Sequence, residues 1–106
     1  MFFVFNINMF LSMILQDMYQ EVIGAVCRTT GIDEYSLFNS NSEEAVDARY
    51  LLIHFLSQKL TDIQISHLTK LTRQAVNKIR NNFQHRVKKW SVATNMQQIS
   101  SDIETL

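Results

Sequence analysis

The sequence predicts an all-α protein with a single domain, and three observations support this. Apolar residues recur at steps of three and four in every periodic segment, and no two-residue alternation is long enough for a half-buried strand. Proline is absent and there are only two glycines, so a chain of many tight turns is not expected. The 106 residues are 46% hydrophobic and 19% charged, which suits one small helical bundle with its own core.

Residues 1–17 are predicted to be an apolar lead-in to a first helix over about residues 10–30. The lead-in lacks the basic start of a signal peptide, because no Lys or Arg precedes Arg28, and Asn6, Asn8 and Asp17 interrupt it as a membrane span. A membrane anchor is therefore the weaker alternative. The helix should end where Gly31 can adopt a left-handed conformation. Its predicted apolar stripe consists of Leu11, Ile14, Leu15, Met18, Val22, Ala25 and Val26.

The middle of the chain predicts a short helix followed by a buried one. Asp33 is a cap for a single turn anchored by Leu37 and Phe38. The run NSNSEEAVDARYLLIHFLSQK begins with Asn and Ser caps and becomes apolar from Tyr50 to Leu56, which predicts the central helix. Two residues of types that can act in catalysis lie in these segments, and a structural role is predicted for both. His54 is predicted as a core histidine and Cys27 as a buried, inert thiol.

Residues 61–90 predict two helices joined by a short turn. Thr61 and Gln64 have the spacing of a capping box, and Thr72 is the cap of a longer amphipathic helix. Two such helices, the second of them basic, indicate a helix-turn-helix within a DNA-binding domain at residues 18–90. The contact between the two helices is predicted at Ile65, Leu68, Leu71, Val76 and Ile79. The second helix is predicted to present one inward edge made of Val76, Ile79, Phe83, Val87 and Trp90.

The charge is distributed unevenly along the chain, although the net charge is zero. Residues 1–62 carry three basic and eight acidic side chains, a balance of −5, whereas residues 63–101 carry seven basic side chains and no acidic one. A basic segment of this length favours a polyanion as the partner. The simpler alternative is a solvated basic helix with no ligand, but it does not explain why residues 63–101 contain no carboxylate.

The outer face of the second helix carries the residue types that read DNA bases. Arg and Lys bind the O6 and N7 atoms of guanine, and Gln and Asn bind the N6 and N7 atoms of adenine. The predicted base-reading residues are Arg73, Gln74, Asn77 and Lys78. The predicted phosphate-binding residues are Lys70, Thr72, Arg80, Asn81 and Lys88. The expected partner is double-stranded DNA, bound in the major groove.

These segments resemble a known family. The stretch from Met18 to Phe83 resembles the C-terminal DNA-binding domain of the bacterial replication initiator DnaA, which has a Trp-repressor-like helix-turn-helix fold. The matching pieces are VIGAVCRTTGIDEYSLFNS, EAVDARYLLIHFLSQKLT and ISHLTKLTRQAVNKI. The resemblance implies the same fold and a DNA-binding face. It also implies that Arg73, Gln74 and Ala75 stand where the family carries His-Thr-Thr, and Thr72 where it carries Asp.

The chain departs from the family at other positions too. Glu43 and Glu44 replace a basic loop that reaches the minor groove, although Arg49 is retained. Lys70 replaces the usual Gly of the turn, which would cost about 1 kcal/mol if that position is left-handed. The family's ATPase module is missing. The resemblance therefore implies a stand-alone regulator that keeps the fold but not the initiator's own DNA site.

The tail at residues 91–106 is predicted to be a short amphipathic helix. Its apolar stripe has a heptad-like spacing and comprises Val92, Met96, Ile99, Ile103 and Leu106. So short a helix is marginal by itself, so it must pack on its own domain, pair with a second chain as a homodimer, or fray. Packing on its own domain is the favoured outcome.

The composition argues against an enzyme. The chain lacks the glycines of a phosphate-binding loop, and one Cys with three scattered His gives no zinc spacing, so no cofactor, metal or small-molecule substrate is expected. A single cysteine suits the cytoplasm. The rival to DNA binding is a protein-interaction module that keeps the initiator-like fold, and a membrane-tethered regulator is a third, weaker reading.

Overall fold

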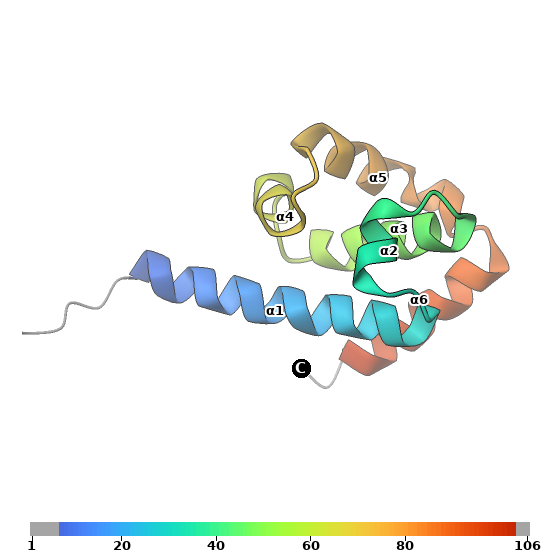
Figure 1. Ribbon diagram of the computed structural model, residues 1–106, viewed down its shortest axis with the longest axis horizontal. Helices are drawn as coiled ribbons and strands as arrows, with labels where there is room; N and C mark the ends of the chain where they lie inside the picture. The colour runs from blue at the N-terminus through green and yellow to red at the C-terminus, as the bar shows by residue number, and fades with distance from the viewer. Residues whose placement is uncertain (1–6, 104–106) are drawn as a thin grey trace, which may run out of the picture.

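The structure is a computed structural model that describes residues 7–103, and it is helical throughout that range apart from short connections (Figure 1). This confirms the all-α prediction. Residues 1–6 of the lead-in and Leu106 of the tail stripe lie outside the described residues. The helices are α1 (Ile7–Thr30), α2 (Glu34–Asn39), α3 (Glu43–Ser57), α4 (Asp62–Thr69), α5 (Arg73–Arg86) and α6 (Trp90–Ile103).

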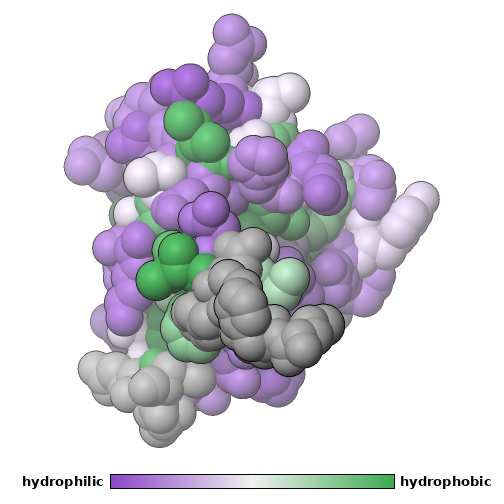
Figure 2. All heavy atoms as spheres, turned by 90° about the vertical axis from the view of Figure 1, so that its left-hand side faces the viewer, coloured by the Kyte–Doolittle hydropathy of each residue, from purple (hydrophilic) through white to green (hydrophobic). Residues whose placement is uncertain are grey.

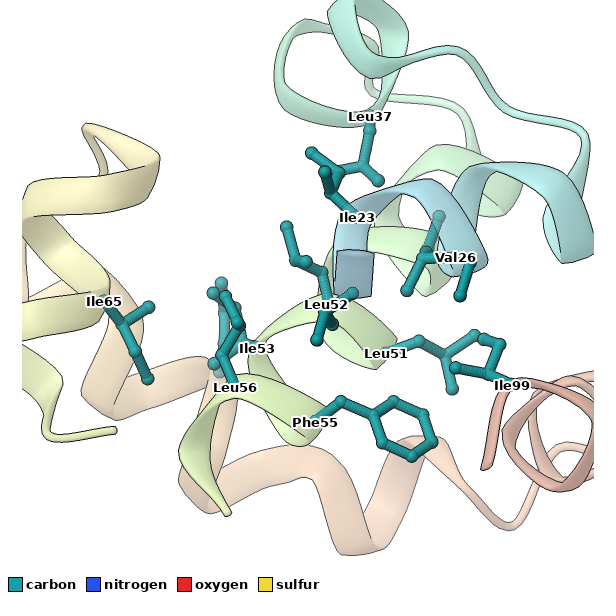
Figure 3. Packing of buried hydrophobic residues seen from close by; sticks show 14 of the residues in the cluster. Ile23, Val26, Leu37, Leu51, Leu52, Ile53, Phe55, Leu56, Ile65 and Ile99 are labelled. Carbon is teal, nitrogen blue, oxygen red and sulfur yellow. The ribbon is translucent and has the colours of Figure 1, made fainter. Parts of the chain in front are cut away.

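Helix α3 is the centre of the molecule, and each of the other five helices contacts it. In Figure 1, α1 runs along one side of α3 while α5 runs along the other. Figure 3 shows Leu51 of α3 directed toward Ile99 of α6, and Ile53 and Leu56 on the side of Ile65 from α4. The fully or nearly fully buried apolar residues of α3 are Ala45, Ala48, Leu51, Leu52, Ile53, Phe55 and Leu56.

The predicted starts of four helices are confirmed by their hydrogen bonds. The side chains of Asp33, Ser42 and Thr72 each accept a backbone N–H from the first turn of the helix that follows. Thr61 and Gln64 form the predicted capping box, in which each side chain binds the other's backbone N–H. Such caps satisfy N–H groups that have no partner within the helix, so they place the starts of α2 to α5 locally.

The prediction of one helix reaching Trp90 is wrong. Helix α5 ends at Arg86, the chain turns through residues 87–89, and Trp90 begins α6 with 79% of its surface exposed. Neither Gly nor Pro marks this break. The turn reverses the chain so that Val92 and Ile99 can be buried against the core, which a continued α5 would have carried away from it.

The tail packs on its own domain, the favoured outcome of the three considered. Helix α6 lies against α1 and α3, with Val92 and Ile99 buried and Met96 packed beside them. Arg28 of α1 and Asp102 of α6 form an ion pair with an N–O distance of 3.2 Å. The buried part of this stripe is occupied within the chain.

Helix α1 starts three residues earlier than predicted, and its apolar stripe divides into two parts. From Leu15 onward the stripe packs on the core, whereas Leu11 and Ile14 remain about half exposed. None of the described helices combines the length and the apolar content that crossing a bilayer requires.

The turn between α4 and α5 contains a backbone conformation that L-amino acids rarely adopt. Lys70 has φ 67° and ψ 7°, and it is the sole non-glycine residue of the described range with positive φ. Side chains clash with the backbone in this region, whereas glycine does not. Lys70 is therefore left-handed, which is the condition under which the sequence predicts backbone strain at this position.

We expect Lys70→Gly to stabilise the protein by about 0.5–1 kcal/mol, because relief of the left-handed strain exceeds the added entropy of glycine in the unfolded chain. The measurement is urea denaturation followed by circular dichroism. Lys70→Ala is the matched control, since it removes the charge but keeps the strain and should change stability little. A Gly variant no more stable than the Ala variant would contradict the prediction.

Candidate nucleic-acid interface

The α4–α5 pair is joined by three residues, and hydroxyl groups hold this turn in place. The Ser66 hydroxyl donates to the Leu71 carbonyl at 2.6 Å, and the Leu71 N–H donates to the Thr69 hydroxyl at 3.2 Å. Ile65 and Val76 are fully buried, one from each helix. The turn and this buried contact fix α5 rigidly against α4.

Helix α5 buries only a narrow stripe, consisting of Val76, Ile79 and Phe83. All nine side chains predicted as base or phosphate ligands are exposed, both those of α5 and those flanking it. The structure thus brings the predicted residues onto the surface of α5 and its preceding turn, except Lys88, which lies beyond the end of the helix. The first turn of α5 has no acidic residue, so its positive helix end and Arg73 both attract an anion.

Asp62, which the sequence did not single out, binds two of the predicted ligands. Its carboxylate accepts hydrogen bonds from Arg80 Nε and a terminal Arg80 nitrogen, both at 3.0 Å, and from Asn77 Nδ2 at 3.2 Å. The hydrogen bonds from Arg80, followed by that from Asn77, lower the pKa of Asp62. Asp62 begins α4, so α4 ties Arg80 and Asn77 down at the edge of the face.

A second acidic group binds the C-terminal end of α5. Asp47 of α3 is buried and pairs with Arg86 at 3.1 Å and with Lys89 at 2.8 Å, and Lys89 also contacts Glu43. These carboxylates, Asp47 first, raise the pKa of Lys89. The Arg86 guanidinium also lies 4.4 Å from the centre of the Tyr50 ring. This network fastens α5 to α3.

Internal pairing therefore accounts for part of the uneven charge distribution. Of the seven basic residues in the carboxylate-free stretch, Arg80, Arg86 and Lys89 pair with acidic residues from the first 62. Within the described part of the chain, the remaining four have no carboxylate within ion-pair distance. These four, called the free cations below, are Lys70, Arg73, Lys78 and Lys88.

The loop before α3 is arranged for packing. Arg49 donates to the backbone carbonyls of Leu37 at 2.8 Å and Ser40 at 3.0 Å, so its guanidinium closes the end of α2. Glu43 is engaged by Lys89. The Arg49 guanidinium is thus occupied inside the protein.

The two other side chains that could act in catalysis, His54 and Cys27, lie in surroundings that favour a structural role. The His54 ring stacks on Phe83 at 4.0 Å between ring centroids, and burial lowers its pKa, which favours the neutral form. Burial, followed by the charges of Glu34 and Asp33, raises the pKa of Cys27, and a raised pKa makes a thiol a poor nucleophile. Neither residue lies among the predicted ligands.

An open hollow of about 490 Å³ lies at the start of α5, lined by Asp62, Arg73, Gln74 and Asn77. It is wide and shallow, which suits the edge of a large partner better than an enclosed small molecule. In comparisons with protein-family models, curated proteins and solved structures, the chain matches none.

Proposed function

We propose that this protein binds double-stranded DNA, with α4 and α5 acting as a helix-turn-helix and α5 entering the major groove. The observation that carries the proposal is the exposed first half of α5. There Arg73, Gln74 and Lys78 stand on a rigid helix pair, and among the described residues neither cation has a carboxylate within ion-pair distance, although the charge of Arg73 acts on Asp62. Arg73 and Lys78 suit guanine and Gln74 suits adenine, since their donors and acceptors match those base edges.

Phosphate binding is assigned to the groups that flank this face. Lys70 in the turn and Lys88 after α5 are free cations on either side of the reading residues, and the Thr72 hydroxyl and Asn81 amide are exposed beside them. Arg80 is less available, because a phosphate would have to compete with Asp62 for its guanidinium. The same carboxylate repels phosphate directly, so Asp62 limits the affinity.

The resemblance to the DnaA DNA-binding domain supports this proposal, in which the chain is a divergent relative of that domain and a small regulator. Lys70, at the position that the resemblance gives to a glycine of the family, has the left-handed conformation that glycine adopts most easily. The contact with the minor groove is not part of the proposal, because Arg49 is occupied by backbone carbonyls.

Binding to random duplex DNA should weaken steeply with salt. On random DNA, where Arg73 and Lys78 meet phosphates in place of their selected bases, all four free cations neutralise phosphates, and the slope of log affinity against log salt should be roughly −3 to −4. The measurement is fluorescence anisotropy of a labelled duplex at several salt concentrations. Replacing Lys70, Arg73 and Lys78 together by Ala should abolish binding, whereas Lys59→Ala, at an exposed lysine just after α3, should change it little. No binding at low salt would reject the proposal in favour of a protein-interaction module.

Arg73 and Lys88 should affect DNA binding differently. On a site obtained by selection from random sequences, Arg73→Ala should cost about 1–3 kcal/mol and relax the base preference, because a guanine contact is lost. Lys88→Ala should weaken selected and random DNA equally, since phosphates are the same in both. Equal losses for Arg73→Ala on the two DNAs would show that the start of α5 does not face the bases.

Asp62→Asn should tighten DNA binding several-fold. The substitution removes a negative charge from the face and releases Arg80, which should make the salt slope steeper by about one. Asp17→Asn on α1 makes the same change in net charge on a helix that packs on the opposite side of α3, and it should have little effect (Figure 1). If both variants gain equally, the gain reflects net charge alone and α5 is not the binding face.

A further inference from the structure

The first part of α1 is a helix with apolar side chains exposed on more than one side. It extends beyond the body of the molecule (Figure 1), and Figure 2, which looks onto this end, shows apolar atoms among the hydrophilic surface. Ile7, Leu11, Met13 and Ile14 are 62%, 50%, 59% and 46% exposed, and residues 7–16 include no charged side chain. An apolar helix stripe is normally buried, and the described residues do not cover Ile7, Leu11 and Ile14.

One line of this helix has the spacing of a coiled-coil seam. Ile7, Leu11, Ile14 and Met18 follow one another at steps of four, three and four. This order of steps is the same in both directions. Two copies running antiparallel would therefore match Ile7 with Met18 and Leu11 with Ile14 on both sides of a two-fold axis. A seam of this kind is complementary to itself.

The body of the protein provides a seat at the inner end of the seam. Met18 lines a hollow of about 310 Å³ together with Val22, Phe55, Leu56 and Ile103, which come from α1, α3 and α6. In the antiparallel match, Ile7 of one copy lies over Met18 of the other, at the mouth of this hollow. An apolar side chain there would contact the apolar part of this lining, which the described residues leave open.

We propose that the protein forms a two-fold symmetric homodimer through this seam, each copy covering the other's hollow. Ile7, Leu11 and Ile14 are between 46% and 62% exposed and Met18 is partly buried, so the seam alone covers less than the ~800 Å² per partner of a standard interface. The seam spans about 17 Å, three turns of helix, so the contribution of the hollow is needed as well.

Charge favours a second copy over a membrane surface. No Lys or Arg precedes Arg28, whereas Asp17 and Glu21 lie just after the exposed turns. Helices that lie on membranes use basic residues to bind anionic lipids, and acidic ones are repelled. A second copy presents an uncharged seam to an uncharged seam. The dimer does not depend on DNA binding, and its test contains no DNA.

The test is the mass in solution by light scattering, across a range of protein concentration. The wild-type protein should be a dimer, and Ile14→Lys should be a monomer because it places a charge on the seam. Met13→Lys is the matched control: it makes the same change on the neighbouring residue, about 130° round the helix axis from the seam. It should remain a dimer. Circular dichroism should show both variants folded, and the milder Ile14→Ala should weaken association at least tenfold.

Orientation is tested by disulfide crosslinking in a Cys27→Ser background. A mixture of Leu11→Cys and Ile14→Cys proteins should crosslink strongly, and Leu11→Cys alone should crosslink weakly, because the antiparallel seam matches unlike positions. Strong crosslinking of Leu11→Cys alone would overturn the antiparallel arrangement. A wild-type monomer at every concentration, or equal dissociation by both lysine variants, would overturn the dimer. A monomer that floats with phosphatidylcholine–phosphatidylglycerol vesicles would replace it with a membrane contact.

Discussion

The burial of α3 is the constraint on which the rest of the structure depends. From Ala45 to Leu56 this helix places apolar side chains on several sides, and a helix of this kind is stable only when other elements cover it. The other five helices cover it. Helices α1 and α2 precede α3 in the sequence, α4 and α5 follow it, and α6 returns to it from the end of the chain. The return of α6 explains why the chain must turn at residues 87–89 although no glycine or proline stands there. Continued straight, α5 would leave Leu51 without its contact at Ile99 (Figure 3).

The way α5 is attached to α3 determines which of its residues remain available to a partner. Phe83 packs on the ring of His54, and Arg86 with the following Lys89 meets the buried Asp47, so the second half of α5 is tied to the core. The first half is held by Val76 and by the hydroxyl-locked turn, and its polar side chains stay outside. Rigid attachment at one end and polar exposure at the other are what a helix needs to read a DNA groove.

Acidic residues have two different structural roles, and the distribution of charge along the sequence does not distinguish them. Asp47 uses two cations for packing, and Asp62 holds one cation at the edge of the candidate interface. The carboxylate-free stretch therefore provides four free cations for a polyanion instead of seven. Attraction of a polyanion to this face depends on the position of those four cations around α5.

The sequence by itself determined the all-α class and the starts of α2 to α5, since caps and the capping box act through hydrogen bonds within three residues. It also showed which polar residues of α5 face outward, because the helical period separates them from Val76, Ile79 and Phe83. Only the tertiary structure decided which cations are free, because Arg80 meets Asp62 across 18 residues and Arg86 meets Asp47 across 39. Periodicity likewise placed Trp90 and Ile14 on inward stripes, yet both are exposed. An apolar stripe shows which side of a helix would be stabilised by burial, but only the tertiary packing decides whether another element buries it.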